Sequence, residues 1–154
     1  MEYTIRDARI TDIERISVLF DLHALGRAED VRRPIGPADL LRQLVYLPQA
    51  IVVVADSRRT IVGAAVLALR PSVARGGYVG TLDVIAAEPE AEEAGVVDSL
   101  VAETLRSARN KGCVAVEAIR PDDAAATARW QGYGFTEAGP RLVRELAPME
   151  AVRR

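Results

Sequence analysis

The sequence has little of what builds disulfides and metal centres. Its 154 residues include one cysteine, Cys113, and one histidine, His23. A single cysteine cannot form an internal disulfide, and the two residues are too few for the cysteine- or histidine-rich sets that hold a structural zinc ion. We therefore expect no metal site. Cys113 is interpreted as a buried, unreactive thiol.

The sequence also lacks a strong charge bias and a long apolar run. Its net charge of −2 gives no pull towards nucleic acid or an anionic membrane. No run approaches the roughly 18 apolar residues of a membrane helix, and no N-terminal segment resembles a signal peptide. The length and the 49% hydrophobic content suit one globular domain. We expect a single cytoplasmic domain over residues 1–146 and a frayed tail over 147–154.

The most informative stretch covers residues 78–112. Tyr78 to Ala87 is an apolar run with one internal carboxylate, Asp83. Pro89 ends this run, because proline cannot donate to a sheet ladder. Apolar residues then recur at helical spacing from Val97 to Ala108, and this spacing predicts an amphipathic helix. Acidic residues crowd the loop between strand and helix, at Glu88, Glu90, Glu92 and Glu93.

The rest of the chain predicts short strands and helices around this unit. In chain order we expect a strand at 3–9, an N-capped helix from residues 11–12 to 20, a helix at 38–46, strands at 51–55, 61–69 and 113–119, a helix at 124–131, and strands at Phe135–Glu137 and Arg141–Leu146. The strand at 113–119 follows a helical crossover, so it should lie parallel to the strand at 78–87.

The stretch around Pro89 resembles the signature segment of the GNAT acetyltransferases. In that family a strand leads through a proline and an (Arg/Gln)-x-x-Gly-x-(Gly/Ala) loop into a helix. The opening, YTIRDARITDIERISVLF, also resembles the start of GNAT domains. The resemblance implies an α+β fold, an α/β/α sandwich. Its central mixed, mostly antiparallel sheet would have six to seven strands, with about four helices.

The resemblance further implies that the loop cradles the diphosphate of acetyl-CoA. The first N–H groups of a helix are unpaired and suit an anion, and the candidate donors lie in Ala94, Gly95, Val96 and Val97. Only Gly95 matches the motif, because Glu92 stands at the Arg/Gln position and Val97 at the small-residue position. A like-charge contact at about 4 Å costs up to ~4 kcal/mol at an effective dielectric of ~20. The alternative interpretation is that Glu92 and Glu93 simply stabilise the helix N-terminus.

The tail carries a second part of the resemblance. The family pattern Asn-x-x-Ala-x-x-x-Tyr-x-x-x-Gly-Phe falls on Asp123, Ala126, Trp130, Gly134 and Phe135. Asp123 and Trp130 are therefore candidate contacts of the cofactor. In many members the Tyr returns a proton to the leaving thiolate, but an indole N–H does not titrate usefully. Trp130 packs either the pantetheine arm or the ordinary core.

Two carboxylates within apolar strands are the candidate general bases. Asp83 and Glu117 lie on strands that we expect to be neighbours, and each could accept the amine proton through one water. The alternative for each is a charge that faces solvent or pairs with an arginine. Backbone amides where the two strands part, at Val84 and Ile85, are expected to polarise the thioester carbonyl.

These features together predict an acyl-CoA-dependent N-acyltransferase that moves an acetyl group from acetyl-CoA to an amine. The acceptor would be a small molecule or a peptide. The sequence does not decide whether the chain forms a homodimer. The alternative is a GNAT-like domain that does not use CoA, either as a binding or regulatory module or as a transferase with another acyl carrier. Tyr133 could serve as a phenolic acid only if the last helix shifted its register, and His23 lies where the sequence is least informative.

Overall fold

A five-stranded sheet in the order β1-β2-β3-β4-β5 forms the centre of the molecule. The computed structural model describes residues 1–25, 37–119, 123–139 and 144. The strands are β1 (Thr4–Asp7), β2 (Ala50–Ser57), β3 (Thr60–Ser72), β4 (Gly77–Ala87) and β5 (Cys113–Ala118). Neighbours pair antiparallel from β1 to β4, whereas β4 and β5 pair parallel. The expected crossover is confirmed.

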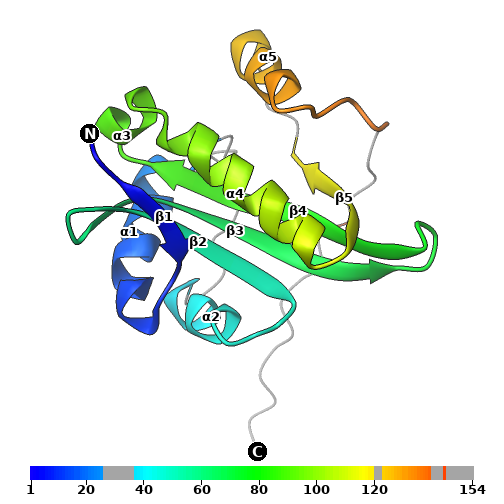
Figure 1. The fold of residues 1–154 in the computed structure, drawn as a ribbon, viewed down its shortest axis with the longest axis horizontal. Coiled ribbons are helices and arrows are strands. Elements are labelled where there is room, and N and C mark those ends of the chain that lie inside the picture. Colours follow the sequence, from blue (N-terminus) through cyan, green and yellow to red (C-terminus); the bar gives the residue numbers. More distant parts are fainter. Residues whose placement is uncertain (26–36, 120–122, 140–143, 145–154) are drawn as a thin grey trace, which may run out of the picture.

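Five α-helices are described around the sheet. They are α1 (Ile13–His23), α2 (Pro37–Leu44), α3 (Pro89–Glu93), α4 (Val96–Asn110) and α5 (Ala124–Gly132), and a 3-10 turn, η1 (Ile10–Asp12), precedes α1. Figure 1 shows α4 crossing the sheet along its front and α5 standing apart at the top of the view. No helix among the described residues is long and apolar enough to cross a membrane.

Alternation along the strands divides the core into two clusters. Val53, Ala55 and Leu67 belong to the cluster that packs against α4, and their neighbours Val52, Val54 and Val66 belong to the cluster with α1 and α2. Successive strand side chains point to opposite faces, so both faces of β2 and β3 are covered. This explains why these strands are almost continuously apolar rather than alternating.

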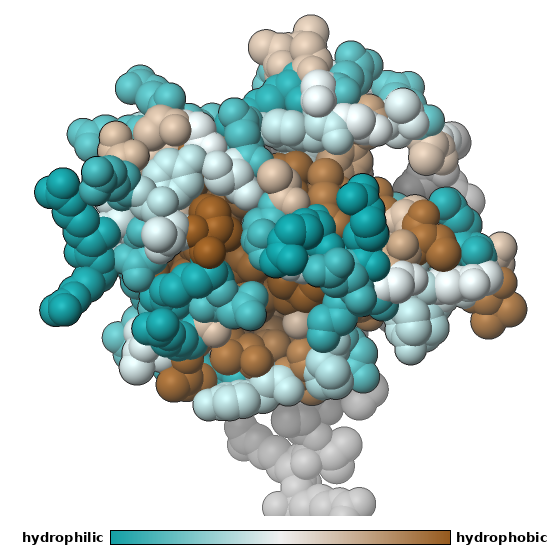
Figure 2. Space-filling model, viewed as in Figure 1, coloured by the Kyte–Doolittle hydropathy of each residue, from teal (hydrophilic) through white to brown (hydrophobic). Residues whose placement is uncertain are grey.

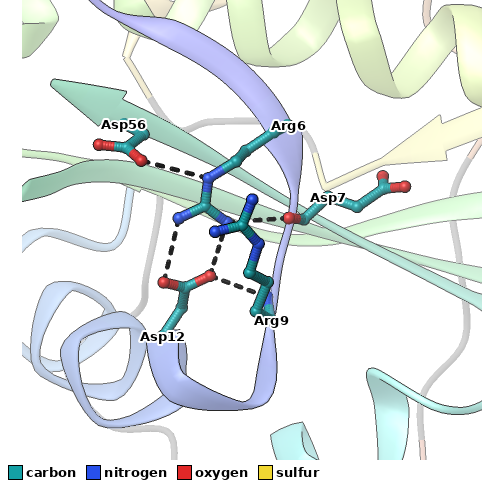
Figure 3. A network of polar contacts seen from close by, with 5 residues as sticks. All are labelled: Arg6, Asp7, Arg9, Asp12 and Asp56. Atoms are coloured by element: carbon teal, nitrogen blue, oxygen red, sulfur yellow. Dashed lines mark hydrogen bonds and ion pairs between the residues drawn. The ribbon is translucent and has the colours of Figure 1, made fainter. Parts of the chain in front are cut away.

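A charged network fixes β1 to the start of α1. Arg6 of β1 donates to Asp12 at 2.8 Å and 3.2 Å, and through Nε to Asp56 of β2 at 3.2 Å (Figure 3). Asp12 also accepts from the backbone N–H of Arg9. The hydrogen bond from Arg6 lowers the pKa of Asp12, against the opposing effect of burial. Asp12 therefore has a structural role: its hydrogen bonds hold the turn between β1 and α1.

Three expectations about the fold need correction. The described sheet has five strands rather than six to seven, since Phe135–Glu137 is irregular and Arg141–Leu146 lies outside the described residues except for Arg144. The described helices number five rather than about four. The extra helix is α3, where the expected acidic loop winds into one helical turn because Pro89 is well placed at its first position.

Candidate active site

Strands β4 and β5 part in the middle of β4. Their parallel pairing ends where Leu82 meets Ala118, while β4 continues to Ala87. A β-bulge marks this point, because Val66 of β3 pairs with Val84 and Leu67 pairs with Leu82. Asp83 is thus the extra residue of the bulge, and bulges often re-aim side chains beside active sites. We call the space beyond Leu82 the β4–β5 opening.

The edge of β4 at this opening is partly covered by the residues that follow α1. The backbone N–H of Leu25 donates to the carbonyl of Ile85 at 2.9 Å, and Ala24 forms an isolated antiparallel bridge with Ala86. A strand residue directs its N–H and its carbonyl to the same edge. The N–H of Ile85 therefore points to the opening, whereas Val84 turns towards its partner in β3.

Asp83 and Glu117 lie on neighbouring strands next to the opening. Glu117 pairs in register with Thr81, two residues before Asp83. Val116 and Ala118 pack on the α4 side, so alternation along β5 directs Glu117 to the opposite face. Asp83 is exposed, and Glu117 is half-buried and forms an ion pair with Arg70 at 3.4 Å. The structure thus places the two expected bases on neighbouring strands beside the opening.

The junction of α3 and α4 satisfies its own amides. Glu92 N–H donates to the carbonyl of Glu88 at 2.8 Å, Ala94 N–H to that of Glu90 at 3.1 Å, and Gly95 N–H to that of Glu92 at 3.1 Å. Gly95 has φ +89°, a left-handed conformation that glycine adopts without strain. The junction is therefore a closed helical turn rather than an open loop.

The two valines that follow are buried. Val96 and Val97 are 0% and 1% exposed, and both belong to the core cluster under α4. Their backbone N–H groups therefore have no access to solvent in this conformation. Val97 stands at the position where the motif has glycine or alanine, so its side chain fills the space that a small residue would leave open.

A charged network joins α5 to the start of α4. Arg129 donates to Glu92 at 2.9 Å and to the hydroxyl of Tyr133 at 2.8 Å, and its Nη2 lies 3.6 Å from Asp98. Tyr133 in turn donates to Asp98. Burial lowers the pKa of Arg129, but its bonds to Tyr133 and Glu92 outweigh that effect and the pKa is raised. Burial, together with the bond to Asp98, raises the pKa of Tyr133.

Asp123 and Trp130 have structural partners on α5. Asp123 is the N-cap, and its side chain accepts from the N–H of Ala126 at 2.7 Å. Trp130 stacks edge-on with Tyr133 and Phe135, at centroid distances of 5.6 Å and 5.1 Å, and packs against the α4 cluster. Neither contact tests a role in cofactor binding, and both residues stay candidates.

These observations do not fit a diphosphate at the start of α4. The amides of Ala94 and Gly95 already have acceptors, those of Val96 and Val97 are buried, and two carboxylates flank the helix end. Sequence reasoning did not find Arg129 or Asp98. The one hint in the sequence was that Glu92, which replaces the Arg or Gln of the motif, could attract a cation. Nothing in the sequence places α5 beside it.

A cavity of about 520 Å³ lies elsewhere, between α2, the start of β2 and the C-terminal half of α4. Its wall is apolar at Leu44, Val45 and Val52 and charged at Glu103 and Arg106. Figure 2 shows brown apolar atoms between teal charged side chains on this face. No residue of β4, β5 or α3 lines the cavity, so it is distinct from the β4–β5 opening.

Comparison with known proteins agrees with this geometry. The model of the acetyltransferase (GNAT) family matches residues 19–135. No curated protein matches the chain.

Solved structures share the fold at low sequence identity. A transcriptional regulator from Bacillus halodurans superposes with a TM-score of 0.79 at 19% identity, over 94% of this chain and 100% of that one. An aminoglycoside 6'-N-acetyltransferase from Acinetobacter baumannii superposes with a TM-score of 0.72 at 19% identity, over 97% and 100%. An aminoglycoside N-acetyltransferase in complex with CoA gives 0.72 at 19% identity, over 94% and 100%.

Proposed function

Because the chain belongs to the GNAT acetyltransferase family, we propose that it transfers an acetyl group from a thioester, with acetyl-CoA as the donor, to an amine at the β4–β5 opening. The observation that carries the proposal is the parting of two parallel strands at a bulge that holds Asp83. This geometry leaves backbone groups and a carboxylate beside a gap between strands. A neighbour of the same fold that binds CoA supports the choice of donor.

In the proposed reaction the amine nitrogen attacks the acyl carbon and the C–S bond breaks. Asp83 accepts the amine proton through one water. The thiolate leaves and takes a proton from solvent. Tyr133 is not needed as the acid, because its hydroxyl hydrogen already bonds Asp98. Glu117, held by Arg70, orients the acceptor amine.

The test is an acetyl-transfer assay with a panel of amines, in which mass spectrometry detects the product. Asp83→Asn should lower kcat by about 10²-fold or more, in the range typical for a general base. Exposed Glu14, in the first turn of α1, gives a matched control. Glu14→Gln should keep the wild-type rate. Equal rates for Asp83→Asn and the wild type would remove Asp83 from the mechanism.

A second candidate function is a GNAT-like module that does not use CoA. The closed turn at Ala94 and Gly95 favours it, because these amides are not available to an anion. This candidate predicts no heat and no thermal shift with millimolar acetyl-CoA. Saturable binding of acetyl-CoA would exclude it.

A further inference from the structure

We infer that this protein recognises its acyl donor without binding the donor's diphosphate, so that an acyl-pantetheine thioester serves as well as the full nucleotide cofactor. This inference rests on the proposed acyl transfer. Three independent features at the start of α4 carry it: the amides, the small-residue position and the charges.

The amides are the first feature. An anion site at a helix start needs N–H groups that point outward and lack a partner. At this junction the N–H groups of Glu92, Ala94 and Gly95 donate to carbonyls of the same turn. The hydroxyl of Tyr3, from the start of the chain, lies 2.7 Å from that of Ser99 on the next turn of α4. The protein's own carbonyl oxygens thus already accept the N–H groups of Ala94 and Gly95 just before α4.

The side chain of Val97 is the second feature. Close approach of a diphosphate to a helix backbone requires a small residue at this position. Val97 is instead 1% exposed and forms part of the core against which Trp130 packs. Opening this site would remove a valine from the core and separate it from its apolar neighbours.

The charges are the third feature. Glu92 and Asp98 both lie at the helix start, and Arg129 contacts both of them. Among the described residues, Arg129 is the cation of this network; it already has two acidic partners, and a diphosphate would have to displace them. Two carboxylates beside a diphosphate are repulsive, and the repulsion grows at low salt.

The β4–β5 opening, in contrast, suits a neutral extended arm. This edge of β4 can take main-chain hydrogen bonds, because the N–H of Leu25 already donates to the carbonyl of Ile85 and covers part of it, and the N–H of Ile85 points to the same edge. An amide-containing chain such as pantetheine can add to a strand edge through main-chain hydrogen bonds. Recognition by the arm alone needs no group at the start of α4.

Calorimetric titration of the wild-type protein with CoA, pantetheine and inorganic diphosphate tests the inference. We expect CoA and pantetheine to bind with Kd values within about threefold of each other, and diphosphate not to compete. If CoA binds about thirtyfold tighter or more and diphosphate competes, the inference is overturned while the proposed function stands. If neither CoA nor pantetheine binds, the proposed function fails and the inference falls with it.

A designed gain of function gives a second readout. The double substitution Glu92→Arg with Val97→Gly should create a preference for CoA over pantetheine of about tenfold or more. Glu93→Arg is the matched control, since it makes the same charge change at an exposed neighbour outside the network. An equal gain from Glu93→Arg would show that bulk charge, and not the closed turn, sets the preference, and would contradict the inference.

Discussion

Arg129 of α5 and Glu92 of α3 form an ion pair of 2.9 Å across the start of α4. Glu92 stands where the family motif has Arg or Gln, so this position carries a negative charge, and Arg129 supplies the positive charge from α5. The pair also connects α5, which stands apart from the sheet in Figure 1, to the helix that covers the sheet. The pair therefore gives the first prediction.

Replacing Arg129 with alanine should lower the free energy of unfolding, because it removes the ion pairs that hold α5 against the start of α4. The side chains of Arg129 and Glu92 are 32% and 37% exposed, so solvent screening limits the pair to about 0.5–1 kcal/mol. A double-mutant cycle of Arg129→Ala and Glu92→Gln, measured by urea unfolding, should give a coupling energy of that size. A coupling energy of zero would show that the pair contributes nothing to the fold.

The pKa of the Tyr133 hydroxyl should lie above the ordinary pKa of a tyrosine. Burial and the hydrogen bond to Asp98 raise its pKa, and Arg129 opposes this to a lesser degree. A raised pKa in the folded protein means that the stabilising contribution of Tyr133 is full below pH 10 and is lost as the pH rises through its folded pKa.

The ionisation of Tyr133 is measured by titrating the ultraviolet absorbance of the wild type and of Tyr133→Phe and subtracting the second curve from the first. Asp98→Asn should shift the step towards the ordinary value, because the carboxylate acceptor is gone. A step at or below the ordinary value in the wild type would contradict the assigned contacts.

The network around Asp12 should make the protein sensitive to acid. The bond from Arg6 lowers the pKa of Asp12 below 3.8. A lowered pKa in the folded state contributes stability above the unfolded pKa, and this contribution is lost as the pH falls through the folded value. Asp12→Asn should therefore cost about 1–3 kcal/mol at pH 7, and the cost should shrink as the pH falls below the ordinary value of 3.8. Urea unfolding of both proteins over a series of pH values from 7 downwards measures the difference, and a pH-independent cost would contradict the charge assignment.

The packing of α4 on the sheet depends on Gly63 of β3. A Cβ at this position would lie 2.7 Å from Cγ1 of Val96 and 3.3 Å from the carbonyl oxygen of Ala86. Gly63→Ala should destabilise the protein by about 1–3 kcal/mol through overpacking. Gly132, in α5, has open space around it, and Gly132→Ala should be neutral or stabilise by up to about 1 kcal/mol. Thermal unfolding should show a lower Tm for Gly63→Ala and an unchanged or higher Tm for Gly132→Ala.

Much of the fold followed from local patterns. The apolar run from Tyr78 to Ala87 and the helical spacing from Val97 onwards are local signals, and both elements lie where they were expected. The parallel pairing of β4 with β5 followed from the handedness and length of the crossover. The turn at α3 was missed because four acidic residues favoured a loop, whereas proline at the first helical position and acidic residues near the helix start favour a helix.

The site could be predicted only in part. Asp83 stood out as a carboxylate in an apolar run, but its place at a bulge depends on register with β3, which one strand's sequence does not carry. The contacts of Arg129 with Glu92 and Asp98 join residues far apart in the chain. Such ion pairs depend on the packing of α5 against α4, and no periodicity in either helix reveals them.

Hydrogen exchange of β4 with and without an acetyl-thioester analogue tests the central claim most directly. The claim is that donor and acceptor meet at the β4–β5 opening, beside Asp83 and Ile85. Peptides covering Asp83 to Ala87 should exchange more slowly when the analogue is bound, because the arm adds to this strand edge. Protection confined to the cavity at Glu103 and Arg106, or no protection anywhere at saturating analogue, would contradict the account.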